Sequence, residues 1–162
     1  MSETLKIIEL LLFKDKILRH YIFNMVIDKK KLIIFKLFIV WIKIMLYANG
    51  TKANLTCFSL FKDFCGIVIE SVLYFIFIMS IFFVNANEII WSLLFGDYVH
   101  VFEFLFIIWN YEDQELYSWI INILTLILHI KIIRIIKGCS YKRAIVGISC
   151  AKVLSSISVR FF

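Results

Sequence analysis

The sequence contains no proline and only five glycines among its 162 residues, so few residues in it interrupt helices. It has four cysteines but no Cys-X-X-Cys pair, and it lacks the His-Glu-X-X-His, Gly-X-Ser-X-Gly and P-loop spacings. These absences disfavour a turn-rich β fold and exclude the commonest signatures of hydrolases, metal sites and nucleotide binding. We therefore expect long helices and no enzyme, and we assign no catalytic, cofactor-binding or metal-ligating residues.

Basic residues are missing from the whole middle of the chain. None of the 18 Lys and Arg residues lies between Asp63 and Ile130, a stretch that holds eight acidic residues. Positive charge marks cytosolic segments of membrane proteins, so this pattern predicts that both flanks lie in the cytosol. A net charge of +6 can also indicate nucleic-acid binding. Here the basic residues alternate with Ile and Phe, which favours anionic lipid head groups instead of a nucleic-acid partner.

Apolar side chains are present in excess. They make up 62% of the residues, and the mean hydropathy is +0.92. Soluble domains are about 45–50% apolar, so this chain carries more apolar surface than a soluble core can bury. The fold class predicted is an all-α integral membrane protein, with helical hairpins in the bilayer and amphipathic interfacial helices at both ends. A soluble protein with a chance surface pattern is the alternative.

The opening segment, residues 5–27, is both charged and apolar. Lys6, Glu9, Lys16 and His20 recur at helical spacing, with Ile, Leu and Phe on the other face. Glu3 and the lack of a small-residue cleavage site do not fit a secretory signal. We expect an in-plane interfacial helix. The alternative is an amphipathic helix packed on a partner protein.

Residues 32–47 form an apolar run that is interrupted by Lys36 and Lys43, which are spaced by seven residues together with Lys29. The run is shorter than the ~20 residues needed to cross a bilayer. We expect a shallow limb whose lysines extend to the head groups.

The uncharged stretch 71–87, with residues 66–70 before it, is the strongest membrane candidate. Residues 89–111 and 116–130 read as a helical hairpin around an acidic tip of Glu112, Asp113 and Glu115. Breaks are expected at Gly50, Gly66 and Gly96.

Residues 138–162 fit either a second interfacial helix or a frayed tail. The chain is thus one membrane domain, 1–162, comprising a cytosolic amphipathic segment 1–31, a hairpin region 32–137 and a basic tail 138–162.

Three polar residues share one predicted helix face, because His100 lies three positions from both Asp97 and Glu103. We interpret them as a polar seam between helices, and the alternative is a set of ligands at a binding site.

We expect Cys57, Cys65, Cys139 and Cys150 to be reduced or palmitoylated.

The opening resembles the start of a reticulon homology domain, in which two aliphatic residues and an acid precede apolar residues, an aromatic residue, a base and an aspartate. The matching residues are Ile7, Ile8, Glu9, Leu10, Leu11, Phe13, Lys14 and Asp15. A second stretch is similar to the family's entry into its second hairpin through Val84, Asn85, Leu94, Phe95, Asp97, Phe104 and Trp109. Residues 123–130, ILTLILHI, resemble the returning limb.

This resemblance implies an endoplasmic reticulum membrane protein that is multi-pass, has both termini in the cytosol, and shapes tubular membrane by placing hairpins mainly in one leaflet. It also implies self-association or association with other membrane-shaping proteins.

Two other functions remain open. Lys131, Arg134 and Lys137 occur at intervals of three, as in a voltage-sensing helix, and Asp97 or Glu103 would be their counter-charges. A channel-like four-helix protein or an accessory subunit of a membrane complex would also fit this composition.

Overall fold

The computed structural model describes residues 12–24, 29–50, 57–83, 86–103 and 114–160, and these ranges contain helices and no strand. The order is α2 (Asp15–Asn24), α3 (Lys29–Gly50), α4 (Cys57–Phe82), α5 (Ala86–Gly96), the 3-10 helix η1 (Asp97–His100), α7 (Gln114–Lys137) and α8 (Tyr141–Arg160). The predicted all-α class is confirmed for these residues.

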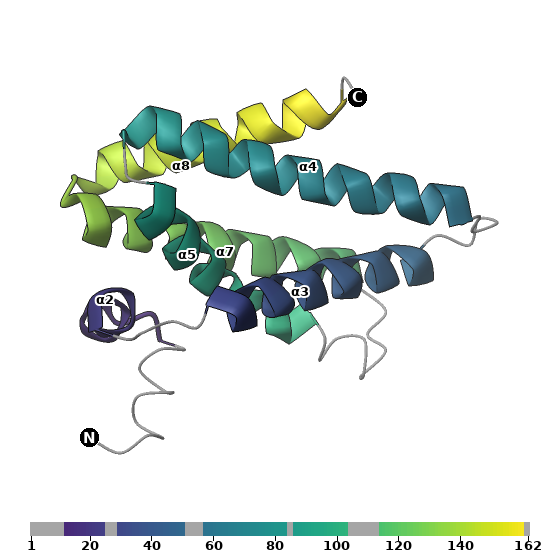
Figure 1. The fold of residues 1–162 in the computed structure, drawn as a ribbon, viewed down its shortest axis with the longest axis horizontal. Helices are drawn as coiled ribbons and strands as arrows, with labels where there is room; N and C mark the ends of the chain where they lie inside the picture. The colour runs from purple at the N-terminus through teal and green to yellow at the C-terminus, as the bar shows by residue number, and fades with distance from the viewer. Residues whose placement is uncertain (1–11, 25–28, 51–56, 84–85, 104–113, 161–162) are drawn as a thin grey trace, which may run out of the picture.

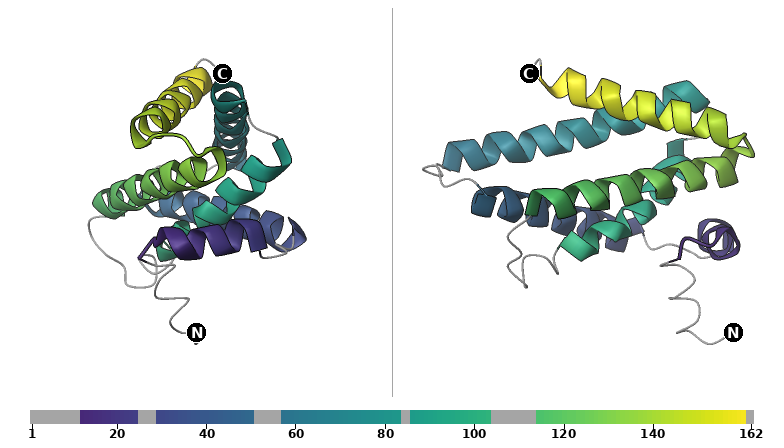
Figure 2. Two further views of the ribbon diagram at one scale, coloured as in Figure 1. Left: turned by 90° about the vertical axis from the view of Figure 1, so that its left-hand side faces the viewer. Right: turned by 180° about the vertical axis from the view of Figure 1, so that it is seen from behind.

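The helices form two layers (Figure 1). Helices α4 and α8 lie side by side in one layer, and α3, α5 and α7 form the other. The most extensive contact between helices joins α4 to α8, although their sequences are far apart. Helix α2 crosses the other helices at one end of the bundle, and a quarter turn of the view shows it lengthwise (Figure 2).

Small residues explain how closely α8 approaches α4. The buried face of α8 carries Ala144, Gly147, Ala151 and Ser155, spaced by three or four residues. A Cβ on Gly147 would overlap the ring of Phe82, so this position needs glycine. Stripes of small residues allow helices to pack at short distance in membrane proteins.

A glycine cap produces the reversal between α7 and α8. Gly138 has φ of +61°, and its N–H donates to the carbonyl of Arg134 at 2.8 Å. This left-handed geometry ends helices, and glycine adopts it without steric cost. The guanidinium of Arg134 lies 4.0 Å from the ring centre of Tyr141, across the turn.

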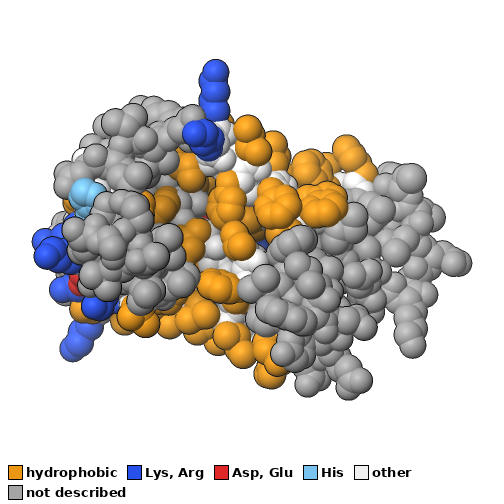
Figure 3. All heavy atoms as spheres, turned by 90° about the horizontal axis from the view of Figure 1, so that it is seen from below, with side chains coloured by type: hydrophobic (Ala, Val, Ile, Leu, Met, Phe, Trp, Pro, Cys, Tyr) orange, Lys and Arg blue, Asp and Glu red, His pale blue; other side chains and the backbone are white. Residues whose placement is uncertain are grey.

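Two helices in the described ranges are long and apolar enough to cross a membrane by length and composition, at Phe64–Phe82 and Leu116–Lys137. Large apolar side chains on them face outward, including Val72 and Ile76 on α4 and Trp119 on α7. Seen from below, apolar side chains occupy the middle of the surface and Lys and Arg lie in the left part of the view (Figure 3).

Charge collects where α7 ends, α8 begins and α2 crosses. We name this the basic end, and it comprises Lys16, Arg19, Lys131, Arg134, Lys137, Lys142 and Arg143. Asp15 ties α2 to it, because its carboxylate lies 3.0 Å from Arg134 Nη1 and 3.4 Å from Lys131 Nζ. Lys131 also donates to the carbonyl of Phe13 at 2.7 Å.

Several expectations about the segments need correction. Gly50 and Gly96 do end helices, but Gly66 lies inside α4 because residues 57–82 form one continuous helix. Within residues 138–162, the described part is not a frayed tail, since α8 (Tyr141–Arg160) packs along α4. Residues 89–111 do not begin as one regular helix, because the chain changes to 3-10 geometry at Asp97. Glu112 and Asp113 of the acidic tip lie outside the described residues, as do residues 5–11 and 25–27 of the opening segment. Glu115 lies in the first turn of α7.

Candidate functional site

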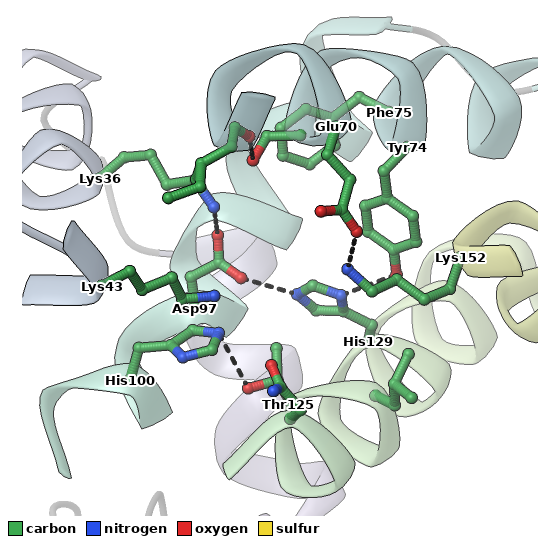
Figure 4. A pocket seen from close by; sticks show the side chains of 14 residues that line it. Lys36, Lys43, Glu70, Tyr74, Phe75, Asp97, His100, Thr125, His129 and Lys152 are labelled. Atoms are coloured by element: carbon green, nitrogen blue, oxygen red, sulfur yellow. Dashed lines mark hydrogen bonds and ion pairs between the residues drawn. The ribbon is translucent and has the colours of Figure 1, made fainter. Parts of the chain in front are cut away.

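A cavity of about 140 Å³ lies between the two layers of the bundle (Figure 4). Five helices contribute polar side chains to its wall, so it joins parts of the chain that are distant in sequence. The polar lining residues are Lys36 and Lys43 of α3, Glu70, Ser71 and Tyr74 of α4, Asp97 and His100 of η1, Asn122, Thr125 and His129 of α7, and Lys152 of α8.

Lys36 and Asp97 form the central ion pair of this cluster. The Asp97 side chain is 5% exposed, whereas that of Lys36 is 22% exposed. The other carboxylate oxygen, Oδ1, lies 3.3 Å from His129 Nε2. Asp97 is therefore held between α3 and α7, and its negative charge is compensated inside the bundle.

Gly96 makes the approach of Asp97 to α7 possible. A Cβ at position 96 would lie 2.8 Å from His129 Cδ2 and 2.8 Å from Ile132 Cδ1. A larger residue would therefore require these α7 side chains or the end of α5 to move. The glycine that ends α5 thus also positions the carboxylate that follows it.

The hydrogen bonds of His129 determine its tautomer. Its Nε2 faces two acceptors, the carbonyl of Leu93 at 3.2 Å and the Asp97 carboxylate. Nε2 therefore carries a proton, and Nδ1 shares a hydrogen bond of 2.9 Å with the hydroxyl of Tyr74. This chain of bonds joins α4, α5, η1 and α7.

His100 begins a second chain of polar contacts. Its Nδ1 lies 2.9 Å from Glu103 Oε1, and its Nε2 lies 3.3 Å from the hydroxyl of Thr125. Glu103 is 1% exposed, and its Oε2 has no hydrogen-bond partner among the described residues. The face shared by Asp97, His100 and Glu103 is thus buried between helices.

Two titratable groups of the cluster lie outside both candidate spans. Burial works to raise the pKa of Asp97, but the Lys36 ammonium and the His129 hydrogen bond outweigh it and hold that pKa below its ordinary value. Burial, assisted by the Lys43 charge, lowers the pKa of His100. Asp97 is therefore ionised, and a neutral His100 is favoured, at neutral pH.

Glu70 and Lys152 connect α4 to α8 at the edge of the cavity. Lys152 Nζ lies 2.6 Å from Glu70 Oε1, which also accepts from the hydroxyl of Ser156 at 2.9 Å. The ammonium lies 5.8 Å from the ring centre of Tyr74. Both charged side chains keep part of their surface exposed, so solvent screens the pair and its contribution to stability is small.

The structure corrects the prediction for Lys36 and Lys43. Both side chains point into the bundle instead of extending to the head groups, and Lys43 reaches toward Asp97 and His100 (Figure 4). No described residue forms a hydrogen bond with Lys43. The seven-residue spacing placed both lysines correctly on one helix face, but that face points into the bundle toward Asp97 of η1.

The basic triplet at the end of α7 does not meet the counter-charges that a sensor would need. Lys131 and Arg134 contact Asp15, whereas Asp97 contacts Lys36. Sequence reasoning missed Glu70, Tyr74, Thr125 and Lys152. The spacing of some of them indicated a shared helix face. Glu70 and Tyr74 are four residues apart in an otherwise apolar helix, and so are Thr125 and His129.

Within the described ranges, no group of three or more His, Cys, Asp or Glu side chains is arranged to hold a metal ion. The chain matches no family model, and neither curated proteins nor solved structures include a significant match. Functional inference therefore depends on the geometry of the chain itself.

Proposed function

We propose that this chain is an integral membrane protein whose basic end lies at the cytosolic face. Support comes from the two apolar helices, α4 and α7, and from their outward-facing Val, Ile and Trp side chains. The acyl chains of a bilayer would cover that surface, and anionic head groups would stabilise the basic end.

We further propose that the protein bends membranes by occupying more area in one leaflet than in the other. The observation that carries this proposal is the position of α2, which lies across the bundle at the basic end and is tied there to α7. Helix α5 adds to the same half of the bundle, because its 11 residues reach only about 16 Å. Both helices would widen the protein in the cytosolic leaflet.

The burial pattern of α2 suits this position. Ile17 and Leu18 are buried against the bundle, whereas Lys16, Arg19 and His20 are exposed. An in-plane helix of this kind displaces head groups without crossing the bilayer. When one leaflet gains area, the bilayer curves so that this leaflet lies on the convex side. A tubule has this curvature, with the cytosolic leaflet outside.

Reconstitution tests this function directly. We expect the purified protein to convert spherical liposomes to tubules, visible by electron microscopy. Asp15→Lys places a like charge beside Lys131 and Arg134, so it should release α2 and reduce tubulation. Lys62→Gln changes an exposed side chain on α4 and is the control. Unchanged vesicles at high protein loading would contradict the proposal.

The same proposal includes three properties that depend on the reticulon resemblance: residence in the endoplasmic reticulum, cytosolic termini and self-association. Fluorescence microscopy of the tagged protein tests its residence in the endoplasmic reticulum. Crosslinking in native membranes tests self-association.

A second candidate is a channel-like or voltage-sensing function, which the cavity favours. Lys36 and Lys43 place positive charge on α3 opposite Asp97, inside the bundle. Moving one charge through 100 mV changes the energy by about 2.3 kcal/mol, so such a helix would respond to voltage. Patch-clamp recording distinguishes the two functions, because a shaping protein carries no gated current.

A further inference from the structure

An open groove of about 900 Å³ lies at the basic end, between the last turn of α4 and the first turns of α8. It is separate from the cavity between the two layers and shares no lining residue with it. Its floor is apolar and includes Ile81, Phe82 and Val146, and three cations border it: Lys137, Lys142 and Arg143.

The charge of the groove is uncompensated among the described residues. Lys142 and Arg143 are exposed and form no ion pair there, and the lining contains no acidic side chain. Lys137 donates one hydrogen to the carbonyl of Phe83 at 3.0 Å, which leaves two of its three donors available. The groove therefore offers several donors to an anion.

The floor is suited to hydrocarbon. Phe83 is 89% exposed and Val146 is 62% exposed, although both are large apolar side chains. Gly147 keeps the floor low where it faces Phe82. Cations at the rim and apolar side chains below them match a molecule that is anionic at one end and apolar at the other.

We propose that this groove binds one anionic phospholipid, with its phosphate beside Lys142 and Arg143 and the start of its acyl chains on Phe83 and Val146. The inference rests on the proposed membrane location. A net negative head group is favoured over a zwitterionic one, because three neighbouring cations would repel choline. A bound lipid at this position would fasten the α7–α8 turn to the cytosolic leaflet.

Native mass spectrometry of the detergent-solubilised full chain tests the site with phosphatidylglycerol and phosphatidylcholine as probes. We expect one retained phosphatidylglycerol and about tenfold weaker retention of phosphatidylcholine. Lys142→Gln with Arg143→Gln should weaken phosphatidylglycerol binding by about tenfold or more. Lys142→Arg with Arg143→Lys keeps the charge and should retain it.

The matched control is Lys30→Gln with Lys31→Gln, which removes the same charge from exposed positions on α3. It should leave retention unchanged, because neither residue lines the groove. Val146→Trp fills the groove with all cations in place and should also reduce retention. Circular dichroism verifies that each variant keeps its helix content.

Three outcomes would overturn the site: an equal loss of phosphatidylglycerol retention in the α3 control, equal retention of the two lipids, or displacement of phosphatidylglycerol by inorganic phosphate alone. The membrane location has its own test: if it is wrong, alkaline carbonate releases the protein from membranes. Membrane bending is read only from vesicle shape. The failure of each proposal is therefore distinguishable from the failure of the others.

Discussion

Lys36 of α3 and Asp97 of η1 form an ion pair inside the bundle, although the two residues are 61 positions apart in the sequence. The two side chains differ in solvent exposure: that of Lys36 is 22% exposed and that of Asp97 is 5% exposed. Removing one partner is therefore not equivalent to removing the other.

We expect Lys36→Met to destabilise the protein by about 3–5 kcal/mol, because it leaves a buried carboxylate without its cation. Asp97→Asn should cost less, since the flexible lysine can extend toward the surface. The free energy of unfolding in detergent, followed by circular dichroism, measures both effects. Lys62→Met is the control and should change stability by less than about 0.5 kcal/mol.

The double variant Lys36→Met with Asp97→Asn isolates the interaction. We expect it to be more stable than the sum of the single changes predicts, because neither charge is then left alone. Strict additivity would show that the two side chains do not interact in the folded protein.

The two glycines on the α4–α8 pair should respond oppositely to alanine. A Cβ on Gly147 overlaps the buried Phe82 ring, so Gly147→Ala should destabilise by about 1–3 kcal/mol. A Cβ on Gly66 meets only Val159 Cγ1, at 4.0 Å. Gly66→Ala should therefore be neutral or stabilise by up to about 1 kcal/mol. Thermal unfolding of both variants compares them directly.

A compensating change makes this prediction sharper. Phe82→Leu removes the part of the ring that opposes position 147, so it should recover part of the stability lost in Gly147→Ala. If the two changes instead destabilise additively, the helices do not meet at this pair of residues.

The sequence predicted the helical class and the main apolar segments, because residues 71–82 of the run 71–87 lie in α4 and the run 116–130 lies in α7. It could not predict which face of each helix is buried. Lys36 and Lys43 illustrate why: a lysine in an apolar run extends to water unless another part of the chain supplies a counter-charge. That counter-charge, Asp97, belongs to a distant segment.

The same limit applies to the other polar contacts. Glu70 and Lys152 are 82 residues apart, and nothing local to either residue identifies its partner. The position of Gly66 was predicted wrongly for a related reason. Tertiary packing of α4 on α8 stabilises a continuous helix where local propensity alone favours a break.

The hydroxyl of Tyr74 should contribute measurably to stability. Tyr74→Phe keeps the ring but leaves Nδ1 of His129 without its hydrogen-bond partner in a buried site, which should cost about 1–3 kcal/mol. Tyr141→Phe is the matched control, because its ring stays beside Arg134 and its side chain is 44% exposed. Chemical unfolding of the two variants gives the comparison, and equal stability would exclude a role for the Tyr74–His129 bond.

The side of the membrane on which α8 ends is the most discriminating prediction. Helix α8 begins at the basic end and runs back along α4, yet it is not one of the two candidate spans. The end of α8 lies beside the far end of the α4 span, because Val159 Cγ1 is 4.0 Å from the Cβ position of Gly66. If α4 crosses the bilayer from the basic end, the end of α8 lies on the opposite face, whereas insertion from one face keeps it cytosolic. The proposed bending requires the second arrangement, so we expect a C-terminal tag to be digested by protease added to sealed microsomes, as an N-terminal tag should be. Protection of the C-terminal tag alone would place the ends in different compartments and rule out insertion from one face, on which the proposed bending depends.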